Sequence, residues 1–138
     1  MKPYRFFIFF VLICSLNCTP LKKTNPPKEI IKGTSWTLQS LNGNIVTTDN
    51  SIKSSAFLNF GADGLLSGNT SCNSFSGKYS IEGNKINLNP GAMTRMMCPG
   101  AGEQDFLTAI KQVTNFKITA GKLSLQNGTS EIMSFISK

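Results

Sequence analysis

The feature that most restricts the fold of this chain is a series of short segments in which apolar and polar residues alternate, each followed by a turn signal. Leu58 and Phe60 share one face of such a segment, and a glycine-rich turn at residues 61–64 follows directly. Tyr79 and Ile81 share one face of another, ahead of a second turn. Alternation with a period of two is typical of half-buried strands, and short turns between such strands predict antiparallel hairpins.

The alternating pattern recurs from Gly33 onward, without a regular strand–helix–strand order. Strands are expected at residues 34–41, 56–60, 65–68, 75–81, 85–89, 116–119, 122–126 and 131–136. The strand at 85–89 is expected to end at Pro90-Gly91, and residues 45–55 are expected to form an irregular connection. Strands this short leave exposed sheet edges, which closure of the sheet removes.

Residues 103–115 are expected to form the helix of the domain. Phe106 and Ile110 recur at helical spacing, and the acidic Glu103 and Asp105 suit the positive end of the helix dipole. The predicted fold is therefore mainly β (α+β): an antiparallel curled sheet or small open barrel of about eight strands, with one helix packed on it. The expected core residues are Trp36, Leu38, Leu58, Phe60, Phe75, Ile86, Leu88, Phe106, Ile110, Leu123, Leu125 and Phe135.

The first residues have the organisation of a secretory signal peptide. Lys2 and Arg5 give a positive start, and residues 6–16 form an apolar run. That run is too short for a membrane-spanning helix, which needs about 20 residues. Cys18 follows it, and the segment resembles a bacterial lipoprotein signal, in which the cysteine after the cleavage point is lipidated. An ordinary cleaved signal and an uncleaved anchor are the alternatives.

The chain is therefore expected to have three parts. Residues 1–17 are expected to be a signal peptide, residues 18–32 a lipidated cysteine with a flexible tether, and residues 33–138 a single domain. The formal net charge is +7, but most of the basic excess lies before Gly33. We therefore expect the basic segment to lie near an anionic membrane, and no nucleic acid is expected as a partner.

The cysteines, and the absence of histidine, limit the kinds of catalytic and metal site that this chain can form. If Cys14 leaves with the signal peptide and Cys18 is acylated, Cys72 and Cys98 remain, in an oxidising compartment. A disulfide between them closes a loop of about 27 residues and contributes about 3.5 kcal/mol in the chain-entropy model. Two reduced, buried thiols are the alternative. Because the chain has no histidine, a Ser-His-Asp or Cys-His arrangement cannot be built, and we expect no enzyme activity, metal or cofactor.

Two polar, glycine-punctuated motifs contain these two cysteines, and together they are interpreted as a structural clasp. They are N-T-S-C-N-S-F-S-G-K-Y at residues 69–79 and G-A-M-T-R-M-M-C at residues 91–98. Arg95 is interpreted as fixing the second motif through backbone carbonyls or a carboxylate such as Glu103, with an anionic ligand or partner as the alternative. The methionines of that motif are interpreted as gap-filling core residues, with a binding surface as the alternative.

The two motifs resemble those of the META domain family. C-N-S-F-S-G at residues 72–77 and A-M-T-R-M-M-C at residues 92–98 carry the resemblance, together with an opening W-x-L at Trp36 and a closing L-x-L at Leu123. The resemblance implies a compact, mainly antiparallel β domain with one helix, exported or lipid-anchored in the bacterial envelope. It also implies a link to stress or antibiotic tolerance in some members, and it supplies no known catalytic activity.

We therefore expect a non-enzymatic, lipid-anchored protein of the bacterial envelope, in the outer membrane, that contributes to envelope integrity or to stress or antibiotic tolerance. The alternative is a binding module or carrier for an apolar ligand or an envelope protein partner. The expected site residues are Cys18 for lipidation, Cys72 and Cys98 for the disulfide, and Arg95 and Asn73 for binding. Besides an apolar ligand or an envelope protein, the only partner that we expect is the membrane, through the N-terminal lipid. We expect the chain to be a monomer.

Overall fold

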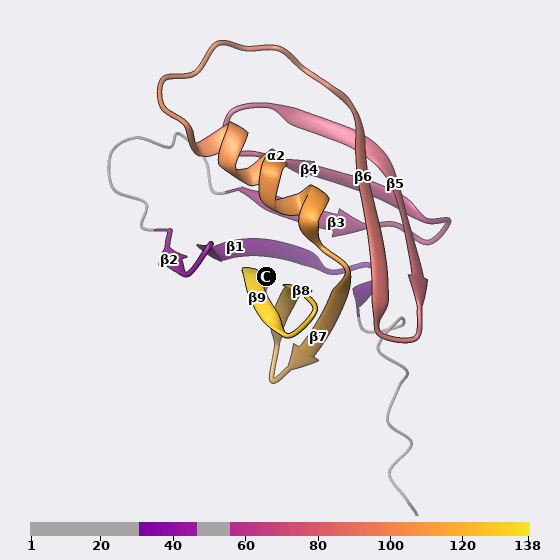
Figure 1. Ribbon diagram of the computed structural model, residues 1–138. Coiled ribbons are helices and arrows are strands. Elements are labelled where there is room, and N and C mark those ends of the chain that lie inside the picture. The colour runs from indigo at the N-terminus through magenta and orange to yellow at the C-terminus, as the bar shows by residue number, and fades with distance from the viewer. Residues whose placement is uncertain (1–30, 47–55) are drawn as a thin grey trace, which may run out of the picture.

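The computed structural model describes residues 31–46 and 56–138 of the 138-residue chain. The expected signal peptide, Cys18 and nearly all of the tether lie outside the described residues, as does most of the connection at 45–55. Within the described part, nine antiparallel strands form one sheet and helix α2 packs against it (Figure 1). The predicted mainly β fold class is confirmed. No helix in this part is long and apolar enough to cross a membrane.

The strands are short and follow one another mostly as hairpins. They are β1 (Ser35–Leu41), β2 (Asn44–Ile45), β3 (Phe57–Phe60), β4 (Leu65–Asn69), β5 (Ser74–Glu82), β6 (Lys85–Met93), β7 (Asn115–Thr119), β8 (Lys122–Asn127) and β9 (Ser130–Ser137). The two-residue β2 was not expected, and it closes a hairpin with β1 through Asn42 and Gly43. Both turn residues have positive φ angles, of 49° and 79°, as the Asn-Gly signal predicts for a tight hairpin turn.

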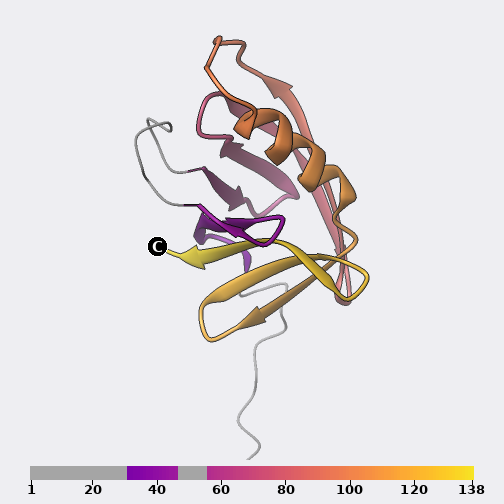
Figure 2. The same ribbon diagram turned by 60° about the vertical axis from the view of Figure 1, so that its left-hand side comes forward.

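The sheet closes into a ring because β1 pairs with β3 on one side and with β9 on the other (Figure 2). Strand pairing within the ring is least extensive between β6 and β7, which share a single register pair, Lys85 with Asn115. Helix α2 (Gly102–Gln112) lies in the connection between these two strands and contacts β1, β6 and β9. The helix therefore covers the place where the two strands diverge.

Side chains fill the interior of the ring. All the predicted core residues are buried, and Leu66, Phe116 and Met133 join them. Each large apolar side chain buried in this way stabilises the fold by about 1.5–3 kcal/mol. The Trp36 indole N–H is satisfied as well, since it donates to the Ile31 carbonyl at 3.1 Å. The ring therefore encloses a packed core.

Strand β6 does not end at Pro90-Gly91 as predicted, but continues to Met93. The register passes from Ser76–Ala92 to Lys78–Asn89, so Pro90 and Gly91 together face Gly77 in a β-bulge. The two backbones approach so closely that a Cβ on Gly91 would lie 2.8 Å from the Gly77 Cα. A proline is tolerated at such a bulge, where the ladder is interrupted. The longer β6 brings the second motif to the same end of the ring as the first.

Helix α2 is shorter than predicted, because Gln112 is its last residue and Val113 is already extended, with φ −65° and ψ 127°. The next residue, Thr114, donates its N–H to the Gln126 carbonyl at 2.8 Å and accepts from the Ile86 N–H at 3.0 Å. Hydrogen bonds to the sheet thus replace the last helical turn that the apolar spacing predicts.

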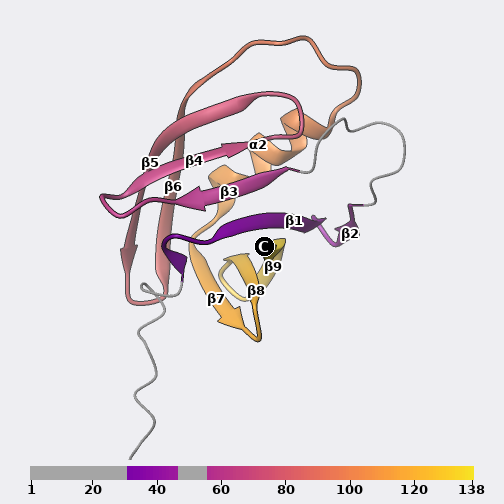
Figure 3. The same ribbon diagram turned by 180° about the vertical axis from the view of Figure 1, so that it is seen from behind.

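The ring has two ends, which differ in what they present. The entry end carries Gly33, whose N–H donates to the Phe60 carbonyl at 3.1 Å, and the β3–β4 and β5–β6 turns. The loop end carries the β1–β2 turn, residues 70–73 and the connection from β6 to α2, which we call the Met97 loop (residues 94–101). Figures 1 and 3 show the Met97 loop and the start of the described domain at opposite ends of the ring.

Candidate binding site at the loop end of the ring

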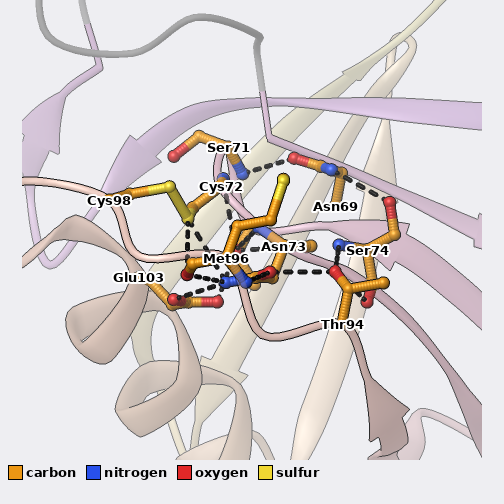
Figure 4. Close-up of a disulfide and its surroundings, with 10 residues drawn as sticks. Asn69, Ser71, Cys72, Asn73, Ser74, Thr94, Met96, Cys98 and Glu103 are labelled. Atoms are coloured by element: carbon orange, nitrogen blue, oxygen red, sulfur yellow. Dashed lines mark hydrogen bonds between the residues drawn. A yellow bond between two sulfur atoms is a disulfide. The ribbon is translucent and has the colours of Figure 1, made fainter.

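Asn73, just before β5, is the centre of a polar network at the loop end. The residue is only 2% exposed. Its Oδ1 accepts from the Met96 N–H at 2.7 Å and from the Thr94 hydroxyl at 2.9 Å. Its Nδ2 donates to the Met96 carbonyl and to the Glu103 Oε2, both at 3.0 Å (Figure 4). One amide side chain therefore joins the start of β5 to the Met97 loop and to the first turn of α2.

The turn that carries Asn73 is closed by Thr70, which is 1% exposed. The Thr70 N–H donates to the Asn73 carbonyl at 2.9 Å, and the Asn73 N–H donates to the Thr70 hydroxyl oxygen at 3.0 Å. The same hydroxyl lies 3.1 Å from the Glu103 Oε1, to which it can donate. Ser71 has a φ of 82°, and its N–H donates to the Asn69 Oδ1 at 2.7 Å. Every buried side-chain nitrogen and oxygen in the described residues has a partner.

We call the hydrogen-bonded group of Thr70, Asn73, Thr94, Met96 and Glu103 the Asn73 clasp. Cys72 and Cys98 are joined by a disulfide next to it, with their Cα atoms 6.0 Å apart. The sequence leaves open a disulfide or two reduced, buried thiols for these cysteines, and the structure contains the disulfide. Cys72 is buried and Cys98 is exposed. The turn at 70–73 and the Met97 loop are thus linked twice, once covalently and once by the Asn73 amide.

The structure corrects the interpretation of Arg95 as a residue that fixes the loop. Arg95 is exposed and forms no hydrogen bond or ion pair with any described residue, while the Glu103 carboxylate is occupied by Asn73 and Thr70. The reason is chemical: Met96 presents both a backbone N–H and a backbone carbonyl. An amide matches that pair with one acceptor and one donor, whereas a guanidinium has donors only. Asn73 therefore holds the loop, and its amide is fully used by the protein.

The methionines of the second motif differ from one another. Met93 is half-buried and packs against the core, as a gap-filling residue does. Met96 is 61% exposed and Met97 is 100% exposed, so the gap-filling interpretation is wrong for these two. The clasp holds Met96 by its backbone, which leaves the side chain outside the core (Figure 4).

A pocket of about 310 Å³ lies beside the clasp. Its apolar part includes Leu38, Ala56 and Phe106, and its polar part includes Ser71 and Asp105. The volume is at the lower end of the range for small-molecule sites, which is about 300–1,000 Å³. No group of three His, Cys, Asp or Glu residues that could hold a metal ion occurs in the part of the chain that the structure describes.

The sequence indicated Asn73, Cys72 and Cys98 but not the partners of Asn73. A threonine three residues before an asparagine is a short-range signal for a side-chain-closed turn, and it could have identified Thr70. Thr94 gives no such signal, because its contact with Asn73 joins residues 21 positions apart. The pocket was missed for a similar reason, since its lining comes from β1, β2 and the turn between them, from Val46 and Ala56, from the β4–β5 turn and from α2.

Comparisons with known proteins agree with this architecture. The model of the META domain family matches residues 29–138. The chain is 30% identical over 129 residues to heat shock protein HslJ of Escherichia coli (strain K12), covering 91% of this chain and 89% of the relative.

Solved structures give the same picture. A protein structure determined by NMR has a TM-score of 0.61 at 27% identity and covers 78% of this chain and 92% of its own. Two others share the fold at lower identity. A DUF4847 family protein from Bacteroides vulgatus has a TM-score of 0.58 at 15% identity, with 79% and 95% of the two chains covered. A Burkholderia xenovorans protein has a TM-score of 0.56 at 23% identity, with 80% and 85% covered. With both motifs in the arrangement described above, this chain belongs to the META domain family.

Proposed function

We propose that the protein is a lipid-anchored, non-enzymatic component of the bacterial envelope, with Cys18 as the lipidated residue. The observation that carries this proposal is the position of Cys18 directly after a short apolar run with a basic start, ahead of a META domain. Two or more acyl chains anchor a protein stably, since each buried methylene contributes about 0.8 kcal/mol. Residues 19–32 then act as the tether, and the outer membrane is the proposed location.

The physiological role that we propose is support of envelope integrity or of stress and antibiotic tolerance, with the domain acting as a monomer. The name of its relative, heat shock protein HslJ, supports the stress part of this proposal. The non-enzymatic part is supported by the lack of histidine in the chain and by the clasp, whose carboxylate and amide are bonded to each other. Neither group is left to act on a substrate.

Anchoring is tested by labelling the full-length protein with radioactive palmitate in a bacterial host. We expect the label in the wild-type chain, its loss in Cys18→Ser and its retention in the matched variant Cys14→Ser. Loss of the lipid in Cys18→Ser should also move the protein from the membrane fraction to the soluble fraction. Label that persists in Cys18→Ser would overturn the lipidation proposal.

A second candidate function is a binding module for a small apolar ligand, and the pocket beside the clasp supports it. The interior of the ring is filled, so a ligand would bind at the loop end, against Leu38 and Phe106. Native mass spectrometry of protein purified from its own membrane is the test. A retained ligand should be lost in Ile45→Arg, which changes the pocket lining, and kept in Ile136→Arg, which changes an exposed isoleucine elsewhere. Protein that carries no ligand contradicts this candidate.

A further inference from the structure

The backbone of the Met97 loop is held at several points from inside the fold. The Thr94 N–H donates to the Ser74 carbonyl at 3.0 Å, both backbone groups of Met96 bond to the Asn73 amide, and Cys98 is linked to Cys72. These attachments all fall within residues 94–98. A surface whose backbone is fixed in advance loses less conformational freedom when it binds a partner.

The opposite side of the same loop has no partner in the described structure. Met97 is fully exposed, Met96 is largely exposed, and Arg95 forms no ion pair with a described residue. Residues 91–102 contain no acidic residue that could neutralise Arg95 locally. Methionine side chains adapt to the shape of a partner, and both methionine and arginine are enriched at protein interfaces. A fixed loop that exposes two methionines beside an arginine with no described ion-pair partner is therefore complementary to an anionic, partly apolar surface.

Two candidate partners have that chemistry, an acidic protein segment and an anionic membrane. The position of the loop distinguishes between them. The Met97 loop lies at the end of the ring opposite Gly33, where the domain follows the proposed tether (Figures 1 and 3). In an anchored protein the tether joins the domain at the entry end, so the loop lies at the end farther from the attachment point. This arrangement favours a protein partner.

We propose that the Met97 loop is a docking site for an acidic segment of another protein. In this complex an acidic side chain of the partner pairs with Arg95, and an adjacent apolar side chain packs against Met96 and Met97. The inference deepens the proposed function and rests on it for the position of the loop relative to the anchor. The charge complementarity and the exposed methionines are independent of the anchor.

The test places a photoactivatable amino acid at position 97 of the full-length protein in living cells. We expect a discrete covalent adduct with a protein, and no such adduct when the label is placed at Leu65, an exposed apolar residue near the entry end. Arg95→Glu should reduce the adduct by about tenfold or more, because it opposes two like charges at the interface. Arg95→Lys should retain most of it, as should Lys78→Glu, a matched charge reversal on the wall of the ring.

Once the partner is identified by mass spectrometry, a charge exchange completes the test. Replacing its acidic residue by lysine should abolish the adduct with the wild-type chain and restore it with Arg95→Glu. The thermal unfolding of Arg95→Glu should match that of the wild type, since Arg95 has no described contact to lose.

Several results would overturn the proposal: no adduct at position 97, an adduct that Arg95→Glu leaves unchanged, an adduct with phospholipid, or one with a second copy of this chain. Palmitate labelling of the same cells separates the two proposals. If the palmitate label is absent while the charge-dependent adduct persists, the anchoring proposal is wrong and the docking proposal is supported. If the palmitate label is present without an adduct, the anchoring proposal is supported and the docking proposal is wrong.

Discussion

In the interior of the ring, side chains such as Phe135 and Leu66 are surrounded by other apolar groups, whereas in the Asn73 clasp one buried amide is held by directed hydrogen bonds. Both regions bury their central side chains, and both join segments that are far apart in the sequence. Packing in the first depends on volume and shape. Bonding in the second depends on which atom donates and which accepts.

This difference predicts opposite tolerances to substitution. An apolar core accepts a change of residue that conserves volume, but it loses stability when a cavity is made. A buried polar network does not accept a substitution that conserves shape but reverses a donor, because the unpaired groups keep their full desolvation cost.

The largest effect is expected for a cavity in the core. Phe135 is fully buried in β9, opposite Leu38 on β1 and Leu123 on β8. Phe135→Ala should lower the free energy of unfolding by about 3–5 kcal/mol in urea denaturation. The neighbouring Ile136 is 45% exposed, so Ile136→Ala should cost less than about 1 kcal/mol. Equal losses in the two variants would show that the ring interior is not the main core.

A smaller but still substantial effect is expected for Asn73→Asp, which conserves the shape of the side chain. The new carboxylate cannot donate to the Met96 carbonyl or to the Glu103 carboxylate, and it lies next to both. We expect a loss of about 2–4 kcal/mol in the same assay. Asn87→Asp on the exposed side of β6 is the control and should change stability by less than about 0.5 kcal/mol. An Asn73→Asp protein as stable as this control would contradict the account of the clasp.

Leu66→Met gives the matching experiment in the core. Leu66 is fully buried on β4, and methionine has nearly the same volume without any polar hydrogen-bonding requirement. The loss in free energy of unfolding should stay below about 1.5 kcal/mol. A larger loss than that of Asn73→Asp would reverse the proposed order of tolerance.

The smallest effect is expected at the exposed ion pair on the outside of the ring, where Glu131 accepts from Ser124 and from Lys122 Nζ at 2.9 Å. Partial burial raises the pKa of the Glu131 carboxyl, but these hydrogen bonds and the Lys122 charge outweigh it, so the pKa lies below its ordinary value of 4.5. The ionised carboxylate thus stabilises the fold above about pH 4.5, and this contribution is lost as the pH falls through the folded-state pKa.

Because the Glu131 pair is partly exposed, the pH-dependent contribution should be below about 0.5 kcal/mol. Urea denaturation between pH 3 and pH 7 measures it, with Glu131→Gln as the comparison. The stability difference between wild type and Glu131→Gln should shrink as the pH is lowered. A difference that grows instead would mean that the sign of the pKa shift is wrong.

The sequence was sufficient for the fold class, most strands and the core residues of the ring but only partly for the clasp, and the same contrast explains why. The alternation of Leu58 with Phe60 and the turn signals that follow it are local patterns, so they identify strands and core residues. The end of β6 was wrong because the pairing of Ser76 with Ala92, a contact with a distant strand, overrides the local signal of Pro90. The bonds of Asn73 to Met96 likewise join residues 23 positions apart and leave no periodic trace.

The Asn73 amide bonds both backbone groups of Met96, so we expect it to hold the Met97 loop even when the Cys72–Cys98 disulfide is reduced. The most direct test is amide hydrogen exchange at the Met96 N–H, which donates to the Asn73 Oδ1 at 2.7 Å. We predict that this amide stays protected when the Cys72–Cys98 disulfide is reduced, and that it loses protection in Asn73→Ala with the disulfide intact. Protection that disappears on reduction and survives in Asn73→Ala would contradict the account.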